Sequence, residues 1–418
     1  MAVAFPFESY AFFFDLLALS FLLLPLYFLL KKEAYRRLAL TVAGIYLIYF
    51  IAPRLVLFYL VFWTVVFFAH RTAFTGVKEK RREFLVVAGW IGIIGLVMPM
   101  IAWKLDSSAF VSFFSDWSNA ALQHLSVKLW EIDMVKPLIA PVGLSFATFR
   151  AIDLLIKTYL GKLETLSYGQ IMFYGFFPPV QIIGPIIEYE EVARQNRSPT
   201  PAEFTDGLIR LSLGIVKVFV LAGLLQHNDI IFSDPQNMPP ATLWLRLIGY
   251  SWYFYLNFSG YSDLAIGISA LYGFQLKENF NFPFFRRNVQ EFWASWHMGL
   301  TRWAQRNIFV PAGGYRAHTQ YRALFLTMMA IALWHNLNAS MLVFGLYHFS
   351  AQMIYRLHAE KHASKGVVIS GHPPVATLPL WRQAGYALLT YVVVLISFPL
   401  ISADIGRALQ LYKALVGL

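Results

Sequence analysis

The sequence contains no cysteine among its 418 residues. Disulfide bonds, thiolate metal ligands and a cysteine nucleophile are therefore excluded, although the absence of cysteine does not identify a cellular compartment. Charged residues are also scarce, because they make up 14% of the chain against about 25% in a typical soluble domain. Hydrophobic residues make up 58%. This composition predicts an integral membrane protein.

Several functional signatures are missing as well. The sequence has no His-Glu-x-x-His pattern and no cluster of carboxylates, so we expect no bound metal. It has neither a P-loop nor a paired-glycine dinucleotide fingerprint, so nucleotide hydrolysis is not indicated. The net charge of +11 comes from short basic clusters between apolar runs, as in cytoplasmic loops that face anionic lipid. We therefore expect membrane lipid as a partner, and no nucleic acid.

Apolar runs long enough to cross a hydrocarbon core about 30 Å thick recur along the chain. We predict membrane spans at residues 11–30, 38–52, 55–69, 85–103, 137–160, 170–187, 207–232, 243–271 and 386–401, and we expect the apolar run at 323–333 to belong to a further membrane helix. No repeat and no linker divides the chain. The sequence therefore predicts an all-α, polytopic integral membrane protein with about 10–11 transmembrane helices and a single membrane-embedded domain over residues 1–418.

The segments between the spans indicate an orientation and an interior. Basic residues cluster at 31–37 and 71–82, which marks both loops as cytoplasmic and places the N-terminus outside. Residues 106–136 mix polar and aromatic residues and predict an interfacial helix. Polar loops are predicted at 188–203, 233–240 and 355–379. Prolines and glycines interrupt the spans at 137–160 and 170–187, and such broken helices indicate a lined interior, because exposed backbone at membrane depth needs cover.

Polar residues gather between positions 257 and 348. Two histidines there, His297 and His335, each follow a tryptophan, Trp296 and Trp334, and lie 38 residues apart. That separation exceeds one helical face, so only a folded bundle could bring the two rings together. Imidazole is the side chain best able to move a proton near neutral pH. Ionisable groups at membrane depth are costly, and they indicate a functional site.

His335 ends the apolar run at 323–333, so we expect it at the end of a membrane helix. A histidine that only packs against a neighbouring helix is one interpretation. A general base or acid is the other, since such groups contribute by taking or giving a proton. Asn336 and Asn338 add polar groups that a packing histidine would not need, which favours the functional interpretation.

The segment around His297 predicts an amphipathic helix. Apolar residues recur at intervals of three and four, at Phe292, Trp293, Trp296, Leu300 and Trp303. The helix is either an interfacial anchor held by arginines or a helix that aims His297 toward His335, and the spacing leaves both open.

Three other ionisable features carry weaker predictions. We interpret His348 as structural. Asp263, in the GYSD sequence, is expected to be buried, where it could orient a histidine or pair with an arginine. Asp153 and Lys157 have the i,i+4 spacing of an internal ion pair.

Six stretches, in the same order, resemble the membrane-bound O-acyltransferase (MBOAT) family. The likeness is to its bacterial branch, which holds the alginate O-acetyltransferase membrane subunit and the D-alanyl-lipoteichoic acid protein. The stretches are PVGLSFATFR (141–150), FFPPVQIIGPI (176–186), FSGYSDLAIG (258–267), ENFNFPF (278–284), EFWASWHMGLTRW (291–303) and LWHN (333–336).

The resemblance implies a ring of helices around a central funnel. The essential histidine of the family falls on His335, in the LWH motif, and its second polar position falls on His297. Residues with substrate-path or supporting roles are then expected among Trp296, Trp334, Asn336, Arg306 and Asp263.

The resemblance also implies a reaction. An acyl group from a cytoplasmic donor would reach the outer face of a bacterial cytoplasmic (inner) membrane. An extracytoplasmic partner protein would then pass it to a hydroxyl of a cell-envelope polymer. The donor, acetyl-CoA or an acyl carrier-protein thioester, is a substrate, and no bound cofactor is expected.

The chain departs from the family pattern at Asn257, Asn307 and Asn336, where aspartate, aspartate and glycine are usual. The PAGG sequence at 311–314 resembles the polysaccharide-acetylating members, so acetyl is the favoured group. D-alanyl transfer to a teichoic acid-type polymer is the alternative, since the modest length resembles the D-alanylating members. The residues alone also leave open a transporter or flippase with broken helices along a pathway, and an inactive scaffold.

Overall fold

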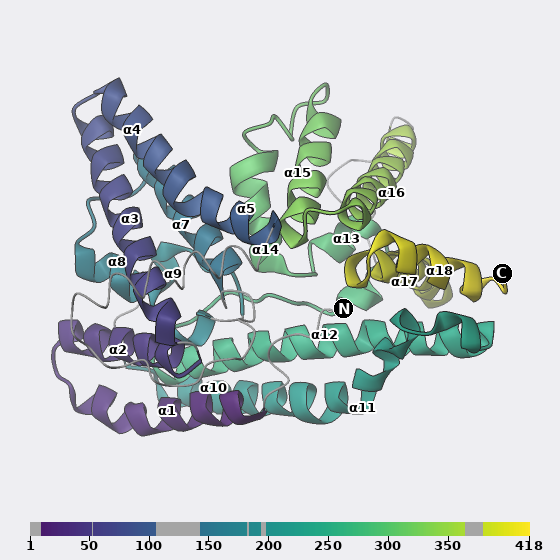
Figure 1. Ribbon diagram of the computed structural model, residues 1–418, viewed down its shortest axis with the longest axis horizontal. Coiled ribbons are helices and arrows are strands. Elements are labelled where there is room, and N and C mark those ends of the chain that lie inside the picture. Colours follow the sequence, from purple (N-terminus) through teal and green to yellow (C-terminus); the bar gives the residue numbers. More distant parts are fainter. Residues whose placement is uncertain (1–9, 52, 106–142, 182–183, 194–197, 364–378) are drawn as a thin grey trace. The chain divides into compact units, whose positions relative to one another are not determined.

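The computed structural model describes residues 10–51, 53–105, 143–181, 184–193, 198–363 and 379–418. The described residues contain helices and no strand (Figure 1), which confirms the all-α prediction. They form two compact units, which we call the N-terminal unit, within Phe5–Leu211 and Leu264–Lys277, and the C-terminal unit, within Ser212–Asp263 and Glu278–Leu418. The predicted interfacial helix at 106–136 lies outside the described residues.

The helices follow the predicted runs closely over most of the chain. Those up to residue 193 are α1 (Tyr10–Leu29), α2 (Glu33–Ile51), α3 (Pro53–Lys78), α4 (Arg82–Gly92), α5 (Met98–Leu105), α7 (Leu144–Tyr159), α8 (Tyr168–Gly175) and α9 (Tyr189–Ala193). The later ones are α10 (Pro201–Ile215), α11 (Gly223–Leu225), α12 (Pro240–Leu271), α13 (Val289–Trp293), α14 (Met298–Ala304), α15 (Gln320–His335), α16 (Ala339–Ala363), α17 (Leu380–Ser402) and α18 (Ile405–Leu415). Short π-helical turns join α4 to α5 (η1, Ile93–Val97) and α10 to α11 (η3, Val216–Ala222) and follow α14 (η7, Gln305–Phe309).

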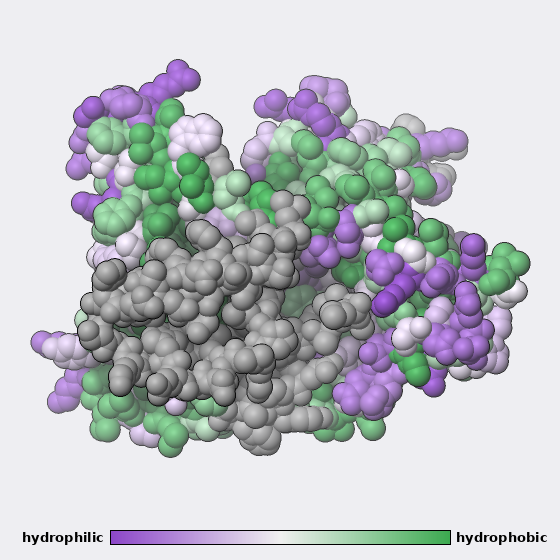
Figure 2. Space-filling model, viewed as in Figure 1, coloured by the Kyte–Doolittle hydropathy of each residue, from purple (hydrophilic) through white to green (hydrophobic). Residues whose placement is uncertain are grey.

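Four helical stretches among the described residues are long and apolar enough to cross a membrane. They are Leu55–Lys78, Arg82–Ile101, Pro201–Phe232 and Leu380–Ser402. Figure 2 shows the α3–α4 hairpin with hydrophobic sides and a hydrophilic tip, which is where the basic residues Lys78, Lys80, Arg81 and Arg82 lie. Apolar sides with a basic end fit helices that face lipid and end at its surface. The total of about 10–11 crossings stays a prediction, as does the single domain.

Close backbone contacts hold the N-terminal unit together. A Cβ atom on Gly44 of α2 would lie 1.8 Å from the carbonyl oxygen of Phe176, and one on Gly175 would lie 2.5 Å from the Trp63 ring. No side chain fits at these distances, so glycine permits the approach. Trp63 and Phe176 are both fully buried. These contacts fix α2, α3 and the end of α8 against one another.

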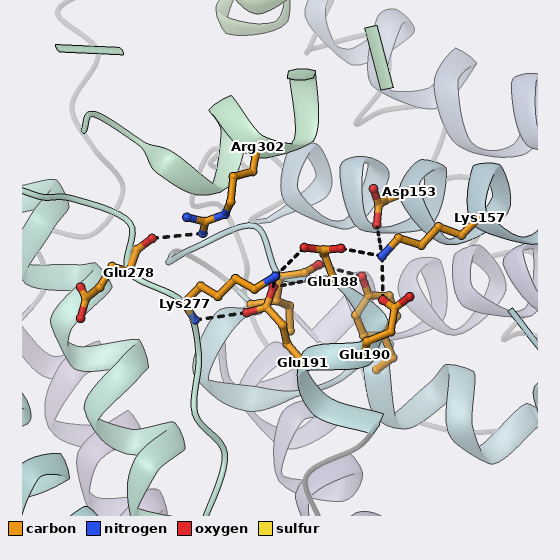
Figure 3. A network of polar contacts seen from close by, with 10 residues as sticks. Asp153, Lys157, Glu188, Glu190, Glu191, Lys277, Glu278 and Arg302 are labelled. Carbon is orange, nitrogen blue, oxygen red and sulfur yellow. Dashed lines mark hydrogen bonds and ion pairs between the residues drawn. The ribbon is translucent and has the colours of Figure 1, made fainter. Parts of the chain in front are cut away.

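The predicted ion pair between Asp153 and Lys157 is confirmed, with 3.2 Å between Lys157 Nζ and the carboxylate. Figure 3 shows that Lys157 also binds Glu188 and Glu190, at 2.7 and 2.6 Å. A second lysine, Lys277, binds Glu188 at 2.7 Å from the other side. The cluster therefore ties α7 to the start of α9 and to the segment that follows α12.

The structure corrects the bounds of the second predicted basic loop. Residues 71–78, predicted as part of a loop, continue α3, and only a tight turn separates α3 from α4. Lys80 closes this turn with a left-handed backbone (φ 55°), and Arg81 N–H donates to the Gly76 carbonyl at 2.9 Å. A helix that ends in this way needs no long connection.

The predicted span at 170–187 is also corrected. Helix α8 covers only Tyr168–Gly175, and a 3-10 turn at Pro178–Val180 follows it. Pro178 and Pro179 have no N–H to donate, so the helix cannot continue through them. The polar loop predicted at 188–203 is likewise partly helical, because it contains α9 and the start of α10.

The end of the chain holds two further corrections. Helix α16 continues to Ala363, so the first residues of the loop predicted at 355–379 are helical, and residues 364–378 lie outside the described residues. Helix α18 was not predicted. Asp404 caps it by accepting the Arg407 N–H at 3.0 Å. Because α18 is short and apolar on one face only, its sequence contains no continuous apolar stretch that would predict a membrane span.

Candidate active site

The backbone at His297 departs from the predicted helix. Helix α13 ends at Trp293, α14 begins at Met298, and His297 lies between them with left-handed angles (φ 42°, ψ 54°). Such a conformation costs a non-glycine residue about 1–3 kcal/mol and persists only where its surroundings impose it. The continuous amphipathic helix predicted here is therefore wrong.

Backbone hydrogen bonds from a distant segment impose this conformation. Met298 N–H donates to the Asn279 carbonyl at 2.8 Å, and Asn281 N–H donates to the Ser295 carbonyl at 3.0 Å. The chain on both sides of His297 is thus held against residues 279–281. This arrangement turns the His297 side chain inward, where only 2% of the residue is exposed.

The His297 ring is enclosed by polar and aromatic groups. Its Nδ1 lies 3.1 Å from Asn279 Oδ1, and the Phe258 ring meets it edge-on with 4.8 Å between centroids. Asn279 is fully buried. Asn279 belongs to the ENFNFPF stretch, whose pattern does not indicate a role for it. The available signal is a pair of amides, Asn279 and Asn281, within an aromatic segment, and the sequence does not distinguish between the two.

His335 is the last residue of α15, which confirms its expected place at the end of an apolar helix. It is half-buried, whereas Asn336 is exposed and has an extended backbone. Asn338 Oδ1 accepts the Met341 N–H at 2.9 Å, in the first turn of α16. Asn338 therefore has a local reason to be polar, because it caps the next helix.

The two histidines meet at one tryptophan. The Trp334 ring lies 4.5 Å from the His335 ring and 6.3 Å from the His297 ring, measured between centroids. His335 is also close enough to His297 to interact with it electrostatically, as is Arg302. The C-terminal unit thus brings together two imidazoles that lie 38 residues apart in the sequence, and the half-buried Trp334 indole is near both.

The other tryptophan of the pair has a different environment. Trp296 stacks against Phe254, Phe284 and Phe292, with centroid distances of 6.0, 5.9 and 5.6 Å. It therefore anchors the turn at His297 in an aromatic cluster. Aromatic pairs of this kind contribute about 0.5–1.5 kcal/mol each beyond their buried area.

Asp263 is buried, as predicted, and Lys217 is one of its partners. Its carboxylate lies 2.6 Å from Lys217 Nζ, and its side chain is 4% exposed. Lys217 belongs to the π-helical turn η3, and such turns occur often at functional sites. Arg306, another expected supporting residue, is half-buried in the π-helical turn η7.

The structural interpretation of His348 agrees with its contacts. Trp293 Nε1–H donates to His348 Nδ1 at 3.3 Å, and His348 Nε2 lies 3.0 Å from Ser397 Oγ. Because Ser397 gives its own proton to the Val394 carbonyl, His348 Nε2 is the donor to Ser397. Both ring nitrogens are thereby used to join α13, α16 and α17.

In the part of the chain that the structure describes, no group of three or more His, Cys, Asp or Glu side chains is arranged so that it could hold a metal ion. The expectation of no metal stays a prediction. What the described site offers is proton chemistry, from two imidazoles within electrostatic reach of each other.

Comparison with known proteins identifies the family. The chain belongs to the membrane-bound O-acyltransferase family, whose pattern matches residues 123–363, a range that contains both histidines. The membership and the four apolar helices confirm a polytopic membrane protein.

Named relatives fall in the predicted bacterial branch. The chain is 32% identical to the probable alginate O-acetylase of Pseudomonas aeruginosa, over 76% of this chain and 60% of the relative. It is 29% identical to the peptidoglycan O-acetyltransferase of Helicobacter pylori, over 59% of this chain and 46% of the relative. It is 28% identical to the teichoic acid D-alanyltransferase of Bacillus subtilis, over 50% of this chain and 58% of the relative. The chain thus spans about half to three fifths of these relatives.

Proposed function

We propose that this protein is a membrane O-acyltransferase. It passes an acyl group, with acetyl favoured, from a cytoplasmic thioester donor across the membrane toward hydroxyls of a cell-envelope or extracellular polymer. The observation that carries the proposal is the meeting of His297 and His335 at Trp334. The names of the alginate, peptidoglycan and teichoic acid relatives support the same reaction class.

His335 is the general base in this proposal. It is half-buried at the end of α15, so a hydroxyl can reach it while much bulk water is kept away. Its imidazole takes the proton of the attacking hydroxyl, the hydroxyl oxygen forms a bond to the acyl carbon, and the carbon–sulfur bond of the thioester breaks. The proton then goes to the departing thiolate, which restores the neutral imidazole.

The donor and the setting of the reaction are part of the same proposal. Acetyl-CoA is the favoured donor, and an acyl carrier-protein thioester is the alternative. The basic hairpin tip between α3 and α4 supports a cytoplasmic location for that end of the hairpin. The N-terminus then lies outside a bacterial cytoplasmic membrane, where a partner protein receives the acyl group.

D-alanyl transfer is the second candidate. The similarity to the B. subtilis teichoic acid D-alanyltransferase covers 58% of that relative, a share close to the 60% for the P. aeruginosa protein. The two candidates differ in the donor, so a donor competition separates them.

The test measures acyl transfer to envelope polymer in membranes that contain the full-length protein and the polymers of its own cell envelope. Labelled acetyl-CoA and a labelled D-alanyl carrier protein are offered in parallel to the wild type, His335→Ala and His318→Ala. His318 is an exposed histidine of the same unit and serves as the matched control. Loss of a general base lowers rates by about 10² to 10⁴, so we expect labelling to fall by at least 100-fold in His335→Ala alone.

The outcomes distinguish the hypotheses. Label from acetyl-CoA supports acetyl transfer, and label only from the carrier protein supports D-alanyl transfer. Equal labelling by wild type and His335→Ala contradicts the proposed base. Polymer export without any covalent label, from either donor, supports the flippase alternative.

A further inference from the structure

The Asn279 amide lies at the centre of a closed hydrogen-bond network. Its Oδ1 is 3.0 Å from the Gly299 backbone nitrogen and 3.1 Å from His297 Nδ1. Its Nδ2 is 2.9 Å from Ser262 Oγ. Asn279 and Ser262 are almost completely buried, so water does not compete for these bonds.

The direction of every bond in this network is determined. A backbone N–H can only donate, so the amide atom that faces Gly299 must be the oxygen. A carbonyl oxygen can only accept, so His297 Nδ1 must carry a hydrogen. At the other end, Ser262 gives its proton to the Phe258 carbonyl at 3.1 Å and therefore accepts from Asn279 Nδ2. The hydrogen positions follow from the partners without a conflict.

A neutral imidazole carries one hydrogen, so a hydrogen on Nδ1 leaves a lone pair on Nε2. We propose that Asn279 is a positioning residue that holds His297 in the Nδ1–H form, so that His297 acts through Nε2 as an acceptor. The role of His297 in acyl transfer rests on the function proposed above, whereas the proton position rests only on the network.

This assignment distinguishes two possible roles of His297, which are orienting the acyl carbonyl and sharing a proton with His335. A residue that orients the acyl carbonyl must donate a hydrogen bond to its oxygen, and Nε2 without a hydrogen cannot do so. A residue that shares a proton needs a lone pair, which Nε2 supplies. When His335 takes the hydroxyl proton, His297 Nε2 stabilises the positive charge on His335. The proton still leaves with the thiol, so the balance of the reaction is unchanged.

The surrounding backbone makes the network rigid. Besides accepting through its side chain, Asn279 accepts the Met298 N–H at its own carbonyl. The same residue therefore fixes both the left-handed turn at His297 and the hydrogen on its ring.

The direct test is nitrogen NMR of the full-length protein in lipid, with ¹⁵N-labelled histidine. The chain has 10 histidines, and His297→Gln identifies the signal of His297. We expect a hydrogen on Nδ1 in the wild type. Asn279→Asp keeps an oxygen that accepts from both Gly299 and His297, so it should retain the Nδ1–H form. Asn279→Leu should lose that preference.

Acyl transfer provides the second measurement. We expect Asn279→Leu to lower transfer by about 10- to 100-fold, as loss of a group that orients an active residue does, and Asn279→Asp to restore most of it. Asn288→Leu is the matched control, because Asn288 caps α13 through the Glu291 N–H in the same region. It should change neither the NMR signal of His297 nor the transfer.

Each outcome separates this inference from the proposed function. A hydrogen on Nε2 of His297 in the wild type overturns the inference even if transfer is normal. A hydrogen on Nδ1 in a wild-type protein that transfers from neither donor overturns the proposed function and leaves the positioning by Asn279 standing. If Asn279→Leu does not fold, failure of Asn279→Asp to keep the Nδ1–H form overturns the inference instead.

Discussion

The lysine cluster of the N-terminal unit allows a comparison of two similar ion pairs at different depths. Lys157 and Lys277 both bind Glu188 with 2.7 Å between nitrogen and oxygen. The Lys157 side chain is 11% exposed and the Lys277 side chain 50%. Lys157 also balances Asp153, whose side chain is 2% exposed. Burial, and not distance, is what distinguishes the two lysines.

We therefore expect Lys157→Met to be much more destabilising than Lys277→Met. Removing one partner of a buried ion pair costs about 3–5 kcal/mol, because the remaining charge stays buried. Removing a partner from an exposed pair costs about 0–1 kcal/mol. Since 1.36 kcal/mol is tenfold in an equilibrium constant, the first change should increase opening of this region by about 100-fold or more, and the second by about fivefold or less.

The absence of cysteine provides the assay. Ala151 lies on α7 and is fully buried. Because the chain has no cysteine, the substitution Ala151→Cys introduces the only thiol of the protein. Its rate of labelling by a thiol reagent in native membranes then reports how often α7 is exposed. Equal labelling rates for Lys157→Met and Lys277→Met would refute the reasoning that burial decides the contribution of each pair.

Two further predictions concern packing and the buried pair near the site. Gly44→Ala should sharply reduce the yield of folded protein, because its Cβ would lie 1.8 Å from the Phe176 carbonyl oxygen. The control Gly169→Ala, whose Cβ would meet nothing within 4 Å, should leave the yield unchanged. A normal yield of detergent-resistant Gly44→Ala protein would contradict the described contact. Lys217→Met should lower the melting temperature because it removes a cation bound to the buried Asp263 carboxylate. Adding Asp263→Asn should recover part of the loss, and a double variant less stable than Lys217→Met would argue against that explanation.

The sequence predicts those features that depend on nearby residues. The apolar run before His335 predicts the end of α15, and the i,i+4 spacing predicts the pair between Asp153 and Lys157, because both depend on one helix. Composition predicts a membrane protein, since contact with lipid favours apolar side chains over much of the surface.

Features imposed by distant residues could not be predicted in the same way. The apolar spacing through His297 continues on both sides, but backbone bonds to 279–281 turn the chain there. Asp263 pairs with Lys217, 46 residues earlier, and nothing in the local sequence predicts that pair. The family resemblance located both histidines but not the amide of Asn279 that orients one of them.

The central claim is that His335 supports acyl transfer from a donor at the cytoplasmic face. The most direct measurement compares sealed membrane vesicles of both orientations, each offered labelled acetyl-CoA or D-alanyl carrier protein from outside. The account predicts label in envelope polymer from inside-out vesicles only, with its loss in His335→Ala and its retention in His318→Ala. Equal labelling in right-side-out vesicles, or unchanged labelling in His335→Ala, would contradict it.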